Sequence, residues 1–237
     1  MKITDVNSII PLECNDLVAI ECIHENAKHK SVECKYEIFI LNKKNEQIAY
    51  FKSKHYILVS GIDKSSNLFT LENIGIECNT DQIQLYRIEE NNTYTYLNTY
   101  EYIETGIEDG YFAIKKNGLY GFINSKGDEV IEPQYEKYRC FQDGLATVRK
   151  NRKWGVINKN NDIIVPFEYC DFDLFNGGYA VMRKQIGNYK TIIDVYNTHG
   201  EIVYKAKVGT KVFNLGNGTL LVKNKSNIEY EFVKLEE

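Results

Sequence analysis

Apolar and polar residues alternate along most of this chain, in short runs separated by polar turns. The stretch GLATVRKNRKWGVINKNNDIIVPFEY, which begins at Gly144, has the two-residue period of a strand with one buried face. It predicts strands at 145–149, 154–158 and 162–166, followed by an aromatic fourth segment. The 18 tyrosines and 11 phenylalanines of the chain favour the half-buried surface of a sheet. The pattern therefore predicts an all-β protein.

This pattern occurs twice in succession. DGYFAIKKNGLYGFINSKGDEVIEPQYEKYRCF begins at Asp109 and DGLATVRKNRKWGVINKNNDIIVPFEYCDFDLF begins at Asp143, an offset of 34 residues (143 − 109). Less similar copies of the pattern occur around three other turns. In all five turns one position is Asn or Gly, and the next position is polar. Asn and Gly most readily adopt a positive φ, so we expect a repeated β-hairpin. The two positions are Asn45, Asn91, Gly127, Asn161, Gly200 and Glu46, Asn92, Asp128, Asp162, Glu201.

The two ends of the chain each supply part of a unit. Residues 217–237 provide two strands, and residues 1–16 provide a last half in which IIP at 9–11 resembles IEP at 131–133 and IVP at 164–166. Two complementary halves leave no exposed sheet edge if they pair with each other. We therefore predict one repeat domain, 1–237, folded as a six-unit β-propeller-like ring whose last unit is completed by both termini. An open β-repeat array or a solenoid is the alternative. The predicted units are about 17–65, 66–108, 109–142, 143–176, 177–216, and 217–237 joined with 1–16.

Composition narrows the class of partner. The formal net charge of −4 gives no electrostatic reason to expect nucleic acid or an anionic membrane as a partner. The chain has no apolar run long enough to span a bilayer, and its first residues lack the apolar region of a secretory signal. Six irregularly spaced cysteines indicate thiols in a reducing compartment. We therefore expect a cytoplasmic monomer.

Candidate chemistry is sparse. Cys22, His24, His29 and Cys34 have residue types that suit zinc, but their spacing does not match paired zinc knuckles, so no metal site is expected. None of the common nucleophile, metalloprotease or phosphate-loop motifs occurs in the sequence. Carboxylate pairs such as Asp171 and Asp173 are typical of solvated loops. We expect no catalysis and no cofactor.

Three residues are candidates for binding a partner. Trp154 precedes Gly155, and Tyr120 stands before Gly121 in the neighbouring repeat. An aromatic residue that recurs beside a glycine is more typical of packing between units than of a residue that anchors a partner. Arg152 lies in the basic stretch VRKNRKWG, which could contact nucleic acid but is more typical of an exposed hairpin.

The segments KWGVINKNNDIIVPFEY and LYGFINSKGDEVIEPQYEKY, each preceded by DGLATV or DGYFAI, resemble the bacterial WG (KWG) repeat family over residues 109–176. Only Trp154 has the full dipeptide, because other units have Phe39, Leu85 and Asp194 at the position of the glycine. The resemblance implies all-β repeats that bind without catalysing a reaction. It also implies similarity to interaction modules and to immunity proteins encoded beside toxins.

Three classes of function follow. The first is a non-catalytic scaffold that binds another protein, most concretely an immunity-type protein that docks on a partner toxin and neutralises it. The second is a propeller that binds a small ligand or a glycan, on which Tyr and Phe could stack. An enzyme with a carboxylate pair or a zinc site is the least favoured of the three.

Overall fold

The computed structural model describes residues 6–12, 17–23, 36–53, 56–62, 66–74, 82–104, 109–187, 190–223 and 230–235. All regular elements in these ranges are β-strands. None of the ranges contains a helix long and apolar enough to cross a membrane. The chain divides into two compact units, Met1–Pro133 and Gln134–Glu237.

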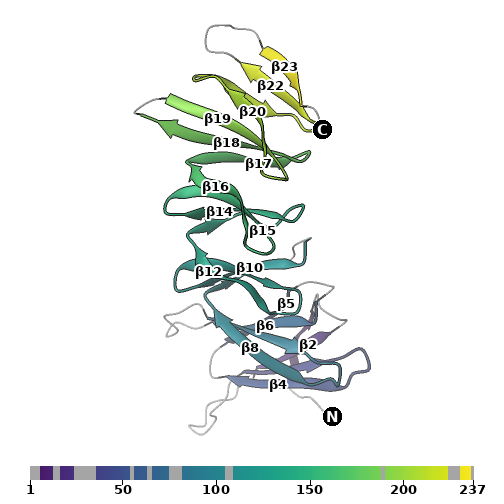
Figure 1. Ribbon diagram of the computed structural model, residues 1–237. Coiled ribbons are helices and arrows are strands. Elements are labelled where there is room, and N and C mark those ends of the chain that lie inside the picture. The colour runs from purple at the N-terminus through teal and green to yellow at the C-terminus, as the bar shows by residue number, and fades with distance from the viewer. Residues whose placement is uncertain are drawn as a thin grey trace. The chain divides into compact units, whose positions relative to one another are not determined.

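The first unit contains three antiparallel four-stranded sheets, and Figure 1 labels several of their strands. The last strand of the third sheet ends just beyond the boundary of this unit. Sheet 1 is β1 (Val6–Pro11), β2 (Val18–Ile23), β3 (Tyr36–Leu41) and β4 (Gln47–Ser53). Sheet 2 is β5 (Tyr56–Gly61), β6 (Leu68–Ile74), β7 (Ile83–Ile88) and β8 (Tyr94–Tyr100). Sheet 3 is β9 (Tyr102–Ile103), β10 (Tyr111–Lys116), β11 (Leu119–Asn124) and β12 (Glu129–Tyr135).

The second unit contains the other three sheets, and the last of these has three strands among the described residues. Sheet 4 is β13 (Lys137–Tyr138), β14 (Leu145–Lys150), β15 (Lys153–Asn158) and β16 (Ile163–Tyr169). Sheet 5 is β17 (Asp171–Asn176), β18 (Tyr179–Ile186), β19 (Lys190–Asn197) and β20 (Ile202–Ala206). Sheet 6 is β21 (Lys211–Asn214), β22 (Thr219–Lys223) and β23 (Tyr230–Lys234).

Each sheet is a meander of strands that are consecutive in the chain. The prediction of an all-β fold built from six small propeller-like sheets is confirmed, whereas closure into a ring stays a prediction. The pairing moves the predicted boundaries by one strand, because the aromatic segment that was expected to end a unit begins the next sheet. In the repeat that contains Trp154, β13 pairs with β14 rather than with the strands that precede it.

The predicted pairing of the two chain ends is wrong for the described strands. β1 pairs with β2, from Val6 opposite Cys22 to Pro11 opposite Val18, and it belongs to the sheet of β3 and β4. Leu12 N–H donates to the Leu17 carbonyl at 2.9 Å beside this pair. A strand that joins its sequence neighbour closes a short loop, and this costs less chain entropy than joining distant segments. The sequence IIP at 9–11 therefore lies in a first strand, whereas IEP and IVP lie in last strands.

The core of each unit consists of side chains that fill the space between successive sheets. Sheets 4 and 5 enclose one cluster, which includes Val156, Val165 and Met182, all fully buried. Sheets 5 and 6 enclose a second cluster around Val181, Val195 and Leu220. Sheet 5 thus buries both of its faces, as alternating apolar residues on opposite faces of a strand allow. In the first unit, sheet 2 packs in the same way against sheets 1 and 3.

The glycine of the WG dipeptide permits close approach of two strands. A Cβ on Gly155 would lie 2.7 Å from the Val165 carbonyl oxygen and 2.9 Å from the Phe167 ring. A Cβ on Gly121 would lie 2.4 Å from the Ile131 carbonyl oxygen. The register between β15 and β16 shifts on both sides of Val156, which marks an irregular pair. The sequence prediction that this glycine allows close packing is consistent with these distances.

One hairpin turn recurs with the same hydrogen bonds. Between β15 and β16, Asn158 Oδ1 accepts from the N–H groups of Asn160 and Asp162, both at 2.9 Å. Asn158 Nδ2 donates to the Asp162 carboxylate at 2.8 Å, and Asn161 has a φ of 67°. The same network surrounds Asn42, Asn124 and Asn197 in the turns of sheets 1, 3 and 5. The predicted hairpin repeat is therefore a specific side-chain motif.

The turn of sheet 2 departs from this motif. Its positive φ is at Asn92 rather than at Asn91, and Glu89 occupies the position of the asparagine. The sequence alignment is therefore shifted by one residue in this turn. Tyr86, and not Leu85, stands at the position of the WG glycine.

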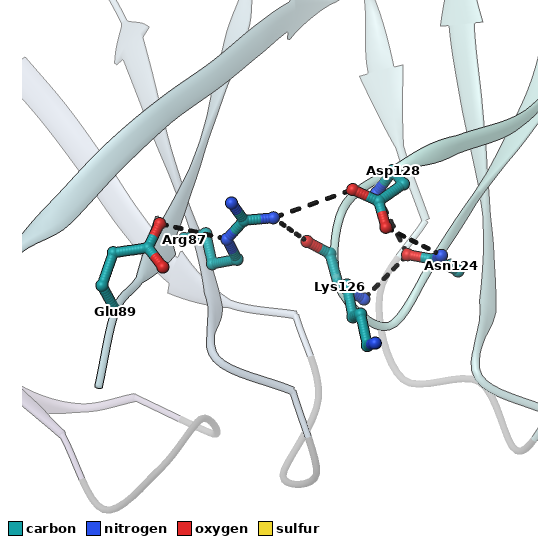
Figure 2. A network of polar contacts seen from close by, with 5 residues as sticks. All are labelled: Arg87, Glu89, Asn124, Lys126 and Asp128. Atoms are coloured by element: carbon teal, nitrogen blue, oxygen red, sulfur yellow. Dashed lines mark hydrogen bonds and ion pairs between the residues drawn. The ribbon is translucent and has the colours of Figure 1, made fainter.

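Arg87 joins this turn to the turn of sheet 3, as Figure 2 shows. Its guanidinium donates to the Glu89 carboxylate at 3.1 Å and to the Lys126 carbonyl at 3.2 Å. It also lies 3.7 Å from the carboxylate of Asp128, which accepts from the Nδ2 of Asn124. Sheets 2 and 3 are thus held together by polar contacts between their turns as well as by their core.

Candidate binding surface

The last sheet presents a face that the preceding sheet buries. Sheets 5 and 6 can be aligned by the pairing of their first two strands. Phe172 lies opposite Met182 in sheet 5, and Val212 lies opposite Val222 in sheet 6, so Val222 corresponds to Met182. By this correspondence Leu221 matches Val181, and Phe232 matches Val195. Val181 and Val195 are 0% exposed between sheets 5 and 6, whereas Phe232 is 71% exposed. The same repeat position is therefore core in one sheet and surface in the next.

The exposed apolar side chains of sheet 6 form a row across its three strands. Phe213 lies opposite Leu221, and Leu221 lies opposite Phe232. Their neighbours Val212, Leu220 and Val222 face sheet 5, so alternation along the strands places the row on the opposite face. Phe213 is 45% exposed and Leu221 is half-buried. Exposed apolar rows of this kind are typical of interaction sites.

Three lysines flank this row. Lys211 and Lys223 are paired across β21 and β22, and Lys223 Nζ lies 4.9 Å from the centre of the Tyr230 ring. Lys234 lies on the other side of the row, two residues beyond Phe232. By strand alternation, no carboxylate of the described sheet shares this face, because Glu231 pairs with the inward-facing Val222. We call the outer face of sheet 6 the C-terminal face; it comprises Lys211, Phe213, Leu221, Lys223, Tyr230, Phe232 and Lys234.

The outer edge of β23 borders this face. Among the described strands β23 pairs with β22 alone, whereas the corresponding β19 pairs with both β18 and β20. Leu235 N–H donates to the Gly218 carbonyl at 2.7 Å, toward β22. Because backbone groups alternate in direction along a strand, the N–H groups of Tyr230, Phe232 and Lys234 point away from β22. The C-terminal face thus ends at backbone groups that can pair with an added strand.

A pocket of about 340 Å³ lies beside β21, between sheets 5 and 6. Arg183 gives it a cationic group, and Lys211 borders it from β21, with its side chain on the C-terminal face. Arg183 donates to both carboxylate oxygens of Asp173, at 2.9 and 2.6 Å, and Asp171 lies 3.6 Å away. The remaining lining residues are Thr191, Ile193, Thr210, Val212 and Phe213.

Trp154 lies in β15, where it packs on the next sheet. Its ring is half-buried and lies 4.7 Å from the Phe172 ring of β17, measured between centroids. The Arg149 guanidinium lies 5.9 Å from the Trp154 ring, and it also bonds the Glu136 carboxylate at 3.0 Å. These contacts support the interpretation of Trp154 as an aromatic residue that packs one sheet on another.

The other two binding candidates each make local contacts within their own unit. Tyr120 belongs to the first unit, where its ring packs edge-on against Tyr102 with Lys115 5.7 Å above it. Arg152 is exposed at the tip of the β14–β15 hairpin, and its φ is 62°. The backbone N–H of Arg152 lies 3.2 Å from both oxygens of Glu136.

Of the four metal-ligand candidates, only Cys22 lies within the described residues. It is buried in β2, opposite Glu37 of β3. His24, His29 and Cys34 fall outside the described ranges. Elsewhere in the described chain, no group of three or more His, Cys, Asp or Glu side chains is arranged to hold a metal ion.

The most buried polar contacts are made by tyrosines that end a last strand. Tyr169 donates to Asp194 at 2.9 Å and lies 2.6 Å from the Tyr196 hydroxyl, so it links β16 to β19. Burial, and then the bonds to Tyr196 and Asp194, raise the pKa of Tyr169 far above its usual range. The phenol therefore stays protonated and acts as a donor between sheets. The sequence interpretation did not single out these tyrosines, although PQY and FEY recur 34 residues apart (169 − 135).

The C-terminal face was also not found from the sequence. Its signal is the alternation in YEFVK, residues 230–234, where aromatic residues occupy one face of a strand. The same alternation would suit a strand buried between two sheets, so only the exposed fractions identify this surface.

Comparison with known proteins gives one family. The model for the WG containing repeat matches residues 120–154 and 154–185, two adjacent repeats. No curated protein matches the chain. Solved structures with a similar fold include a eukaryotic initiation factor (8% identity, 98% of this chain and 79% of that chain, TM-score 0.43). Others are Hsv2 of Kluyveromyces lactis (10%, 90% and 69%, TM-score 0.36) and a putative 6-phosphogluconolactonase of Bacteroides fragilis (9%, 96% and 79%, TM-score 0.28).

Proposed function

This chain carries two adjacent WG-containing repeats, and from that premise we propose that it is a non-catalytic scaffold that binds another protein. The observation that carries the proposal is the C-terminal face. Phe232 is 71% exposed and Phe213 is 45% exposed on a surface whose counterpart in sheet 5 is buried. Exposed aromatic residues near the centre of a patch are typical anchors of protein interfaces.

The specific form of the proposal is an immunity-type protein that docks on a partner toxin. The chain has a net charge of −4, yet the C-terminal face carries three lysines: Lys211, Lys223 and Lys234. Like charges repel across an interface and opposite charges accelerate association. The partner surface that fits this face is therefore apolar at its centre and acidic around it.

The test uses the full chain and the products of genes adjacent to its own. We expect one product to bind the wild-type chain and to lose at least about ten-fold in affinity against Phe232→Ser, because a buried aromatic anchor contributes ~2 kcal/mol or more. Ile163→Ser is the matched control, because Ile163 is 61% exposed on β16, away from the C-terminal face. Equal loss in both variants would contradict a role for this face. Growth of cells that produce the bound partner tests neutralisation: the wild-type chain should restore growth, and Phe232→Ser should not.

A second candidate function rests on the pocket beside β21. Its volume of about 340 Å³ and the guanidinium of Arg183 suit a small anionic ligand. A thermal-shift screen of anionic sugars and nucleotides checks this function, because a ligand that binds the folded state raises the melting temperature. A true ligand should lose its effect with Arg183→Gln and keep it with Lys190→Ala.

A further inference from the structure

Resting on the proposed function, we propose that β23 binds an extended segment of the protein partner as a fourth strand. The segment carries a carboxylate three residues before an apolar or aromatic residue. Strand addition is an established mode of peptide binding, in which the backbone provides affinity and alternate side chains provide specificity.

The pattern of the segment comes from the fourth strands of the complete sheets. Val165 lies opposite Val156, and Tyr204 lies opposite Val195. A carboxylate precedes each of these residues by three positions: Asp162 before Val165 and Glu201 before Tyr204. Sheet 1 repeats the arrangement with Glu46 before Ala49, which lies opposite Ile40. An acidic residue and an apolar residue at this spacing therefore mark the strand that follows the third strand of a sheet.

The open position of sheet 6 can receive the same two groups. Phe232 corresponds to Val195, so an apolar residue of the added strand would lie beside the Phe232 ring. Lys234 corresponds to Asn197, whose Nδ2 donates to the Glu201 carboxylate at 2.8 Å. The Lys234 ammonium donates to the exposed Asn217 carbonyl at 3.3 Å. Turned toward the added strand, it would meet the equivalent carboxylate as an ion pair. The N–H groups of Tyr230, Phe232 and Lys234 point toward the added strand.

A second copy of β23 does not have this pattern. Its only carboxylate, Glu231, is followed three residues later by Lys234 rather than by an apolar residue. A single-stranded nucleic acid could stack on the aromatic residues near the lysines, but it has no strand backbone to pair with the edge. The backbone groups and the repeat pattern together favour a protein segment.

The probe is a fluorescent peptide with the sequence of residues 199–208, HGEIVYKAKV, which contains the chain's own fourth strand of sheet 5. Fluorescence anisotropy measures its binding to the full chain. We expect saturable binding that weakens about three- to ten-fold when the peptide carries Glu201→Lys, because attraction to Lys234 becomes repulsion. The protein variant Lys234→Glu should reverse this preference, and Lys190→Glu, an exposed lysine of β19, should leave it unchanged.

Three results of the binding experiments would overturn the inference. These are an absence of saturable peptide binding, a charge preference that Lys234→Glu does not reverse, and tighter binding of an oligothymidylate than of the peptide. Sedimentation of the wild-type and Lys234→Glu chains tests whether a second copy of this chain binds the edge of β23. A wild-type dimer that dissociates in Lys234→Glu would also contradict the inference. If the peptide fails while partner binding still depends on Phe232, this inference falls and the proposed function stands. If neither depends on the C-terminal face, both fall.

Discussion

At the scale of single residues, a buried tyrosine at the end of a last strand links each of several sheets to the next. Tyr100 donates to Glu129 at 2.7 Å, Tyr135 to Asn161 at 2.6 Å, and Tyr169 to Asp194 at 2.9 Å. All three are 2% exposed. Asp194 is the buried carboxylate among the three acceptors, and because a buried carboxylate without a donor is costly, Tyr169 and Asp194 depend on each other.

Tyr169→Phe should lower the free energy of unfolding by about 1–3 kcal/mol, because it removes the donor to Asp194, which is 8% exposed. Chemical denaturation with fluorescence of Trp154 measures this. Tyr230→Phe is the control; its ring is 50% exposed, and its effect should stay within about 0.5 kcal/mol. Equal effects of the two substitutions would show that the inter-sheet bonds contribute little.

The tyrosines also predict how stability depends on pH. Burial first, and then the contact with Glu129, raise the pKa of Tyr100, as burial and hydrogen bonds do for Tyr169. Their protons are held more tightly in the folded state, so this contribution is fully present below the unfolded pKa of about 10 and is lost as the pH rises above it. We expect alkaline unfolding to accompany tyrosine ionisation in ultraviolet absorbance. Tyr169→Phe should have a shallower pH dependence; an unchanged slope would contradict the assignment.

At the scale of elements, the unit that repeats most faithfully is the hairpin turn around an asparagine. Asn158 and its counterparts Asn42, Asn124 and Asn197 each accept two backbone hydrogen bonds and donate to a carboxylate four residues later. This side chain closes the turn before the next strand begins, so the turn fixes the register of the strand that follows.

Asn158→Ala should destabilise the protein by about 1 kcal/mol, because two backbone N–H groups lose their acceptor and turn instead to water. The change in melting temperature measures it. Asn160→Ala is the control: Asn160 is exposed in the same turn, and the motif uses only its backbone N–H. A larger loss for Asn160→Ala than for Asn158→Ala would contradict the motif.

At the scale of the whole molecule, the same repeat position is buried in one sheet and exposed in the next. Val195 and Phe232 correspond in register, yet Val195 is 0% exposed and Phe232 is 71% exposed. Val195 is covered by sheet 6, and no following sheet of the described chain covers Phe232. A position that is buried in sheet 5 is therefore exposed in sheet 6 of the described chain.

Val195→Ser should lower the free energy of unfolding by about 2–4 kcal/mol, because it removes buried apolar volume and introduces a hydroxyl among apolar side chains. Phe232→Ser should change it by less than about 1 kcal/mol, because its ring is already in water. Denaturation of both variants under identical conditions checks the pair. A loss for Phe232→Ser as large as that for Val195→Ser would mean that this ring is covered in solution.

The sequence by itself determined the all-β fold, its strands and their hairpins. Alternation with a period of two and the Asn or Gly at each turn are local patterns. Such patterns can be recognised in a single sequence because they depend only on neighbouring residues. The aromatic role of Trp154 and the need for Gly155 could be anticipated for the same reason. One register error, at Asn91 rather than Asn92, came from a turn in which Glu89 replaces the asparagine.

Only the tertiary structure decided which strand pairs with which and which apolar faces stay exposed. The segments IIP at 9–11 and IEP at 131–133 look alike, but one lies in a first strand and the other in a last strand. Phe232 and Val195 likewise have the same alternation along their strands. Pairing depends on the loop entropy of alternatives across the whole chain, and exposure depends on whether a neighbouring sheet covers the strand. Neither quantity is a property of the residues alone, so the C-terminal face could not be found before the fold was known.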